Sequence, residues 1–144
     1  MSSEKQYLAA LAAHDKAIEQ IKQLDARLHE LSPFELAKLE YMYTKVERHA
    51  WTIASYFKGQ AKYYEGLAEV SQGTTYKTLR EDKDLGKTSV DAQYESRIAK
   101  GNMLVEASTH EGMYISWRGW SESYAGARNA IKDMIKAIDT EGGK

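Results

Sequence analysis

One short segment near the middle of the chain combines aromatic rings with basic side chains. It contains Tyr56, Lys58, Lys62, Tyr63 and Tyr64. Proteins that bind single-stranded nucleic acids stack bases on aromatic rings and place ammonium groups against phosphates. These residue types suit a surface for a single strand. Composition alone favours the structural alternative, in which Tyr64 packs in a helix core and the lysines keep an exposed face in contact with water.

The other residues that could carry chemistry lack the arrangement that their chemistry requires. Gly86-Lys87-Thr88 is similar to the end of a phosphate-binding loop, but Glu81 stands where that loop needs a glycine. No hydrolase motif of serine, histidine and aspartate is present. The histidines lack the spacing of metal ligands; they are His14, His29, His49 and His110. We therefore predict a protein that is not an enzyme, with no catalytic residue, cofactor or metal.

Composition limits the kind of protein further. The chain has 144 residues, which suits one domain, and hydrophobic residues make up 42% of them. Twenty Lys and Arg residues face 21 Asp and Glu residues, so any contact with nucleic acid must come from a local patch. The chain has no cysteine, no signal peptide pattern and no apolar run of membrane-spanning length. We expect a soluble cytoplasmic protein that does not enter a membrane.

Apolar residues spaced three and four apart predict two long amphipathic helices, over residues 3–31 and 33–70. The boundary is marked by Ser32, Pro33 and Glu35, which form a capping box with proline at the first helical position. The second helix would be roughly 55 Å long, so we expect the two stripes to join subunits of a homo-oligomer. The residues assigned to this oligomer interface are Leu11, Ile18, Ile21, Leu28, Leu39, Val46, Ile53 and Phe57.

The remainder of the chain is predicted to be a polar connection over residues 71–89 and a third helix over residues 90–139. Thr88 or Ser89 is the expected cap of this helix. Its apolar stripe runs from Tyr94 to Ile115 and then changes phase at Trp117, which predicts a kink, a break or a change of partner face near residues 112–119. The expected fold class is all-α, with three long amphipathic helices.

The segment from Lys58 to Gly66 resembles a signature of the UvsY-type recombination mediators of T-even phages. That signature is a lysine, four residues, a tyrosine pair, one residue and a glycine, here Lys58, Tyr63-Tyr64 and Gly66. The segment also ends a predicted long helix and precedes a polar connection. The C-terminus is similar as well, since residues 130–132 read Ala-Ile-Lys and the chain closes with Glu-Gly-Gly-Lys at 141–144.

This resemblance implies a protein that binds single-stranded DNA as a ring-like homo-oligomer. It would help to load a RecA-like recombinase onto strands covered by single-strand-binding protein. Lys58 is the best candidate DNA contact, with Tyr63 beside it. The second basic residue of the family, two positions after the first, is Gln60 here, and Lys62 is the nearby lysine that could take its place.

A second hypothesis belongs to a different functional class. The chain would be a structural or assembly protein whose helices join subunits or a partner helix and which does not bind DNA. The nearly neutral net charge of −1 favours this alternative.

Overall fold

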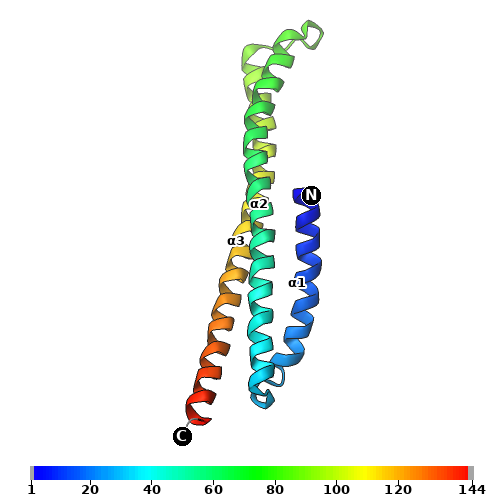
Figure 1. The fold of residues 1–144 in the computed structure, drawn as a ribbon. Coiled ribbons are helices and arrows are strands. Elements are labelled where there is room, and N and C mark those ends of the chain that lie inside the picture. Colours follow the sequence, from blue (N-terminus) through cyan, green and yellow to red (C-terminus); the bar gives the residue numbers. More distant parts are fainter. Residues whose placement is uncertain (1, 143–144) are drawn as a thin grey trace. The chain divides into compact units, whose positions relative to one another are not determined.

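The computed structural model describes residues 2–142 and is built from three long helices (Figure 1). They are α1 (Ser3–Asp25), α2 (Pro33–Glu81) and α3 (Ser89–Gly142). Two short 3-10 helices lie in the connections, at Leu28–Glu30 and Lys83–Leu85. No strand occurs among residues 2–142. The predicted all-α class with three long helices is confirmed.

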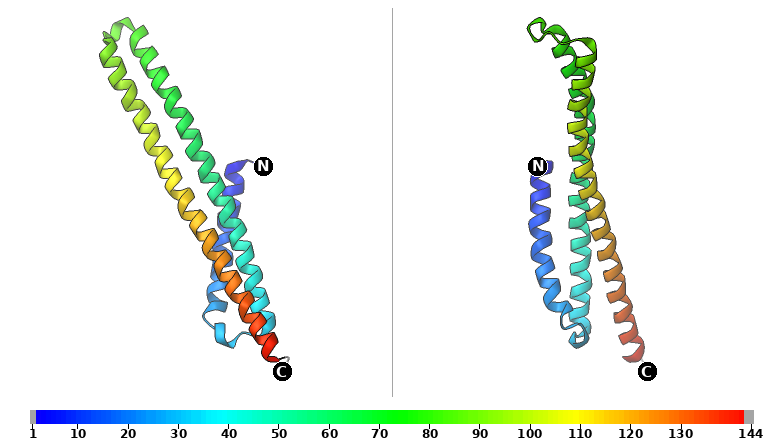
Figure 2. Two further views of the ribbon diagram at one scale, coloured as in Figure 1. Left: turned by 90° about the vertical axis from the view of Figure 1, so that its left-hand side faces the viewer. Right: turned by 180° about the vertical axis from the view of Figure 1, so that it is seen from behind.

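Contacts divide the chain into two compact units, where its length had suggested one domain. Unit 1 comprises Met1–Tyr56 and Ile115–Lys144, and unit 2 comprises Phe57–Tyr114. In unit 1, α1 packs with residues 33–56 of α2 and residues 115–142 of α3 as a three-helix bundle. In unit 2, residues 57–81 of α2 and 89–114 of α3 form an antiparallel hairpin (Figure 2).

The core of unit 1 draws apolar side chains from all three helices. Its buried members are Ile21, Leu31, Leu36, Leu39, Met42, Val46, Ala50, Tyr124 and Ile131. Removing these side chains from water supplies the main driving force for the bundle, at roughly 25 cal/mol per Å² of apolar surface.

The residues assigned to an oligomer interface are largely engaged within a single chain. Ile21, Leu39, Val46, Ile53 and Phe57 are buried. The other three, Leu11, Ile18 and Leu28, are half-buried. A subunit contact through the buried side chains would therefore require the chain's own packing to open, and their role between subunits stays a prediction.

The junction between α1 and α2 is the predicted capping box. The Ser32 hydroxyl accepts a hydrogen bond from the Glu35 backbone N–H, and the Glu35 carboxylate accepts one from the Ser32 N–H, both at 3.2 Å. Leu31 and Leu36, on either side of the cap, are buried together in the unit 1 core. The cap and this hydrophobic staple fix where α2 begins, as predicted.

The predicted end of the first helix at residue 31 is wrong, because α1 ends at Asp25. Arg27 leaves the helical region at φ −116° and ψ 27°, and the next turn is the 3-10 helix Leu28–Glu30. In a 3-10 helix, residues three apart lie on the same side. This geometry lets Leu28 and Leu31 both face the core.

The polar connection predicted over residues 71–89 is much shorter, because α2 continues to Glu81. Gln72, Thr75 and Leu79 continue the helical spacing of buried Ala68 and are partly covered. These facing side chains are mostly polar or small, so a search for large apolar residues misses them. Packing within the hairpin outweighs the low helix propensity of the glycine and threonines in this segment.

Different local interactions determine the two ends of the turn between α2 and α3. Gly86 adopts the left-handed conformation at φ 59°, which suits a residue without a Cβ. Thr88 caps α3: its hydroxyl accepts from the Asp91 N–H at 3.1 Å, and the Asp91 carboxylate accepts from the Thr88 N–H at 3.3 Å. The predicted cap of the third helix is confirmed at Thr88.

The predicted break near residues 112–119 does not occur, since α3 is helical from Ser89 to Gly142. Its facing side chains keep a spacing of three and four through this stretch, at positions 107, 110, 114, 117, 121 and 124. The apparent change of phase arose from large apolar residues between 94 and 115 that lie on the other side of the helix. From Trp117 onward this facing side also contacts α1, since Trp117 and Tyr124 both meet His14.

The capping box gives a prediction about acid stability. Hydrogen bonds from the Ser32 backbone and side chain, together with Arg27, lower the pKa of Glu35 below its ordinary 4.5. A lowered folded-state pKa stabilises the protein above the unfolded pKa, and this contribution is lost as the pH falls through the folded value. Glu35→Gln should therefore lower the free energy of unfolding at pH 7.

Urea unfolding followed by circular dichroism between pH 7 and about pH 3 measures this effect. The difference between Glu35→Gln and the native chain should shrink as the pH falls below about 4.5. Glu30→Gln, an exposed carboxylate in the preceding 3-10 helix, is the control. A difference that stays constant with pH would contradict the assignment.

Candidate nucleic-acid interface

The segment that carries the family resemblance is one uninterrupted stretch of α2 within unit 2. Lys58 and Lys62 are four residues apart, so they lie one turn apart on the same side of the helix. Tyr63 lies about 100° further round. Gln60, two residues from Lys58, points roughly to the opposite side and is half-buried. The structure thus brings the two lysines together and leaves Gln60 out of their surface.

Neither lysine has a carboxylate partner among residues 2–142. Lys58 and Lys62 are exposed, and the Nζ of Lys58 lies 5.3 Å from the ring centre of Tyr114 on α3. This cation–π contact positions the ammonium group without neutralising its charge. Elsewhere in unit 2, Lys87 pairs with Glu95 at 2.8 Å and Lys100 with Glu69 at 2.9 Å.

The two tyrosines of the signature have different surroundings. Tyr64 is half-buried and stacks on His110 of α3, with ring centres 5.1 Å apart. Tyr63 is 59% exposed and touches Tyr64 edge-on at 5.3 Å. The structural interpretation of Tyr64 is therefore supported, whereas the ring of Tyr63 has a face free for stacking.

His110 is the centre of this aromatic packing, and sequence reasoning gave it no role. Its ring lies between Phe57 and Tyr64, two residues one heptad apart on α2. Its Nδ1 lies 2.8 Å from the carbonyl oxygen of Glu106. Because a carbonyl only accepts, Nδ1 must carry a proton and donate. The heptad spacing of Phe57 and Tyr64 was the one signal for this contact, since it predicts a facing residue on another helix.

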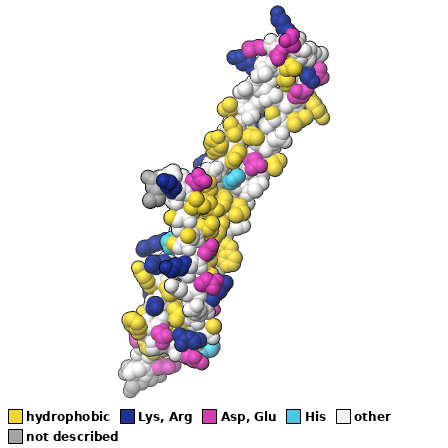
Figure 3. All heavy atoms as spheres, turned by 90° about the vertical axis from the view of Figure 1, so that its right-hand side faces the viewer, with side chains coloured by type: hydrophobic (Ala, Val, Ile, Leu, Met, Phe, Trp, Pro, Cys, Tyr) yellow, Lys and Arg dark blue, Asp and Glu magenta, His cyan; other side chains and the backbone are white. Residues whose placement is uncertain are grey.

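Charges around the two lysines are mixed. Glu65 and Glu69 follow on the same helix, and acidic and basic residues are nearly equal in number across unit 2. Figure 3 shows Lys and Arg interspersed with Asp and Glu on the face that it draws, with no broad basic surface. Any strand would be held by a few lysine contacts rather than by a general positive field.

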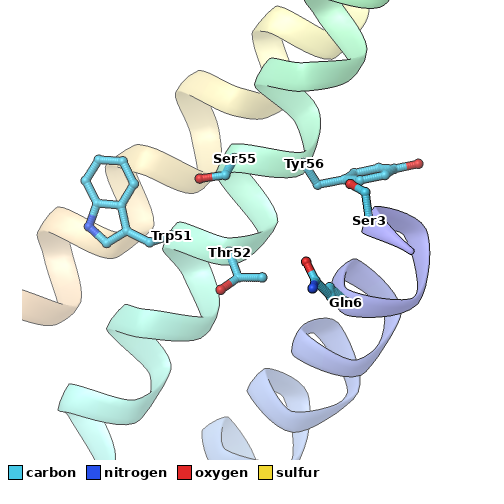
Figure 4. A pocket seen from close by; sticks show the side chains of 6 residues that line it. All are labelled: Ser3, Gln6, Trp51, Thr52, Ser55 and Tyr56. Atoms are coloured by element: carbon cyan, nitrogen blue, oxygen red, sulfur yellow. The ribbon is translucent and has the colours of Figure 1, made fainter. Parts of the chain in front are cut away.

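Unit 1 contains a shallow polar hollow of about 370 Å³ between α1 and α2. Figure 4 shows Thr52 and Ser55 between the indole of Trp51 and the side chains of Ser3 and Gln6, with Tyr56 reaching toward the start of α1. The Thr52 hydroxyl already donates to the Arg48 carbonyl at 3.2 Å. The lining offers no acid or base for catalysis.

A second hollow of unit 1, about 500 Å³, is lined by aromatic rings around a buried histidine. His14 Nδ1 lies 3.0 Å from the Asp15 carboxylate, so it donates, and Nε2 forms a hydrogen bond with the Tyr124 hydroxyl at 2.8 Å. Trp117 meets the His14 ring edge-on at 5.0 Å. Burial raises the pKa of Tyr124, with neighbouring Tyr43 and Asp15 adding to the effect. The phenol therefore stays protonated.

No protein-family profile matches the chain, and no curated protein or solved structure is significantly similar to it. Among residues 2–142, no group of three or more His, Asp or Glu side chains is placed to hold a metal ion. Within the same residues, no helix combines the length and apolarity needed to cross a membrane.

The different surroundings of the two tyrosines predict different effects of removing them. Tyr64→Ala should lower the free energy of unfolding by about 2 kcal/mol, because it removes a ring packed on His110. Tyr63→Ala should change it by no more than about 0.5 kcal/mol. Urea unfolding followed by circular dichroism measures both changes, and equal losses in the two variants would make Tyr63 a structural residue.

Proposed function

We propose that this protein is a recombination mediator of the UvsY type. It binds single-stranded DNA as a homo-oligomer and promotes the loading of a RecA-like recombinase onto strands covered by single-strand-binding protein. The protein acts by holding and shaping the strand, and it catalyses no reaction.

One observation carries the proposal. Within the segment that resembles the mediator signature, Lys58 and Lys62 lie on one side of α2, exposed and without a carboxylate partner among the described residues. Tyr63 adds an exposed ring one residue further along. Ammonium groups that contact phosphates and a ring on which a base stacks are the two elements of sequence-independent strand binding.

The small size of this surface explains why the proposed function requires an oligomer. Two lysines per chain contact few phosphates, so a single copy binds weakly. Several copies on one strand raise the effective concentration at each further contact, and avidity grows without any new contact type. A strand held at several points is bent or wrapped, which favours exchange of one coating protein for another.

A second candidate function is supported by the charges and the apolar surface of unit 2. Acidic and basic residues are balanced there, and large apolar side chains on α3 are exposed. These features suit an assembly protein that joins helices and never meets DNA.

Fluorescence anisotropy with a labelled single-stranded oligonucleotide at low salt separates the two candidates. A mediator should bind the oligonucleotide. The logarithm of its association constant should fall with the logarithm of the salt concentration, at a slope of about −1.4 per chain for two phosphate contacts. Lys58→Ala combined with Lys62→Ala should abolish binding and leave the oligomeric state unchanged.

The matched control replaces Lys77 and Lys136, two exposed lysines without ion pairs among the described residues, by alanine. This variant loses the same charge and should bind as the native chain does. Absence of any binding by the native chain at low salt would refute the mediator function. An equal loss in both double variants would show a general charge effect rather than a site.

A further inference from the structure

The outer side of α3 in unit 2 is apolar although no other part of residues 2–142 covers it. Tyr94, Ile98 and Val105 are 69%, 52% and 64% exposed. With Gly101, Ser108 and Gly112 they form a stripe with alternating steps of four and three residues. We call these six residues the outer stripe. It contains no charged residue, which is unusual for the solvent face of a helix.

The opposite side of α3 explains why these large side chains point outward. Many of the residues that face α2 are small: Ala92, Ser96 and Ala107 are buried, and Ala99 is half-buried. A helix whose inner side already packs on its own partner has no structural need for a second apolar stripe. An apolar stripe with the heptad spacing of a coiled coil is a surface for another helix.

We infer that the outer stripe binds the outer stripe of a second copy of this chain, antiparallel, about a twofold axis near Met103. A twofold interface is self-complementary, because each residue meets its partner twice. The stripe has this property in its sequence. In the register centred on Met103, each large side chain faces a small one.

The facing pairs can be read along the helix. Tyr94 meets Gly112 of the second copy, Ile98 meets Ser108, and Val105 meets Gly101, and each pair occurs twice by symmetry. Alternation of large and small residues across an interface lets two helices interdigitate without voids or overlap. The unbroken match of all six residues identifies the occupant as a second copy rather than an unrelated helix.

Charges beside the stripe fit the same register. Arg97 faces Glu111 of the second copy, again twice, while Leu104 meets its own counterpart near the axis. Arg97 and Glu111 are both exposed, and neither forms an ion pair within the described residues. Opposite charges at these flanking positions favour this pairing over other registers.

The surface has the hollow that the pairing needs. A depression of about 440 Å³ lies on α3, lined by Gly101, Leu104, Val105, Ser108 and Thr109. Its small residues lie beside the proposed axis, where the Val105 and Ile98 side chains of the second copy would enter. A Cβ added at Gly101 would meet no atom within 4 Å in the single chain, so the glycine is not required by the chain's own packing.

Other arrangements fit poorly. A parallel pair in register would place Tyr94 against Tyr94 and Gly101 against Gly101, with crowding in one layer and a void in the next. An antiparallel shift by one heptad would place Tyr94 against Val105. The proposed pairing stops before Asp91. In the layer beyond Tyr94, the Asp91 carboxylate would face an apolar side chain of the second copy.

The inference does not rest on DNA binding. Self-association is measured without a strand, so a chain that pairs through the outer stripe but binds no DNA would refute the mediator function and leave this inference standing. A twofold contact closes on itself, and a ring would need a further, head-to-tail contact.

Gly101→Leu tests the pairing without disturbing the chain's own packing. In sedimentation equilibrium, the dissociation constant of the Gly101→Leu dimer should be at least about tenfold higher than that of the native dimer. Gly73→Leu, at another open glycine of unit 2, is the matched control and should associate like the native chain. Unchanged association of Gly101→Leu, or an equal loss in both variants, would overturn the proposal.

Cysteine cross-linking tests the orientation, since the chain has no cysteine of its own. A mixture of Ile98→Cys and Ser108→Cys chains should form a disulfide-linked heterodimer under mild oxidation. Each variant alone should give little product, because identical positions lie about 15 Å apart along the antiparallel pair. Efficient linking of each variant to itself would indicate a parallel pair and overturn the proposal.

Charge reversal provides a third readout that does not depend on side-chain size. Arg97→Glu and Glu111→Arg should each weaken the dimer, and the double variant should restore its affinity. Additive losses without restoration would contradict the register.

Discussion

Close contact between α2 and α3 through small side chains is the constraint on which unit 2 depends. Ala61 and Ala68 of α2 and Ala92, Ser96 and Ala107 of α3 are buried at the facing positions. Small facing residues let two helices approach closely. Van der Waals contact between the helices then takes the place of the large apolar side chains that fill an ordinary core. Large side chains of α3, among them Tyr94, Ile98 and Val105, lie on the outside, where they are available to a partner.

The two outer surfaces of the hairpin therefore differ. α2 carries Lys58, Lys62 and Tyr63, while α3 carries the outer stripe. The aromatic packing of Tyr64 on His110 holds the first surface against α3. In the proposed function, the lysines meet the strand and the stripe joins two copies. A dimer paired through the outer stripe carries Lys58 and Lys62 twice, which provides the avidity that a single pair of lysines lacks.

The sequence predicts elements wherever a local interaction determines them. Ser32 and Glu35 form a reciprocal cap, and Thr88 caps α3, so both helix starts follow from nearby residues alone. The end of α2 could not be predicted in this way. It depends on packing between Thr75 or Leu79 and a helix that follows later in the chain, and the facing residues there are not apolar enough to form a pattern.

The stripe of the third helix shows that one change of phase fits either a break in the helix or a change of face, and only the structure decides between them. The spacing from Tyr94 to Ile115 is regular, but it marks an exposed side, so the phase change at Trp117 reflects two different surfaces and not a break in α3. For the candidate site, spacing placed Lys58 and Lys62 together. The helical stripe also predicted that Tyr64 would pack inward, but only the structure identified its partner, His110, 46 positions further along the chain.

Sedimentation velocity of the native chain, with and without a fluorescent single-stranded oligonucleotide at low salt, tests the central claim most directly. The account predicts a dimer or larger species without DNA, and an oligonucleotide that sediments with it. A monomer at all concentrations, with the oligonucleotide sedimenting as free DNA, would contradict the account.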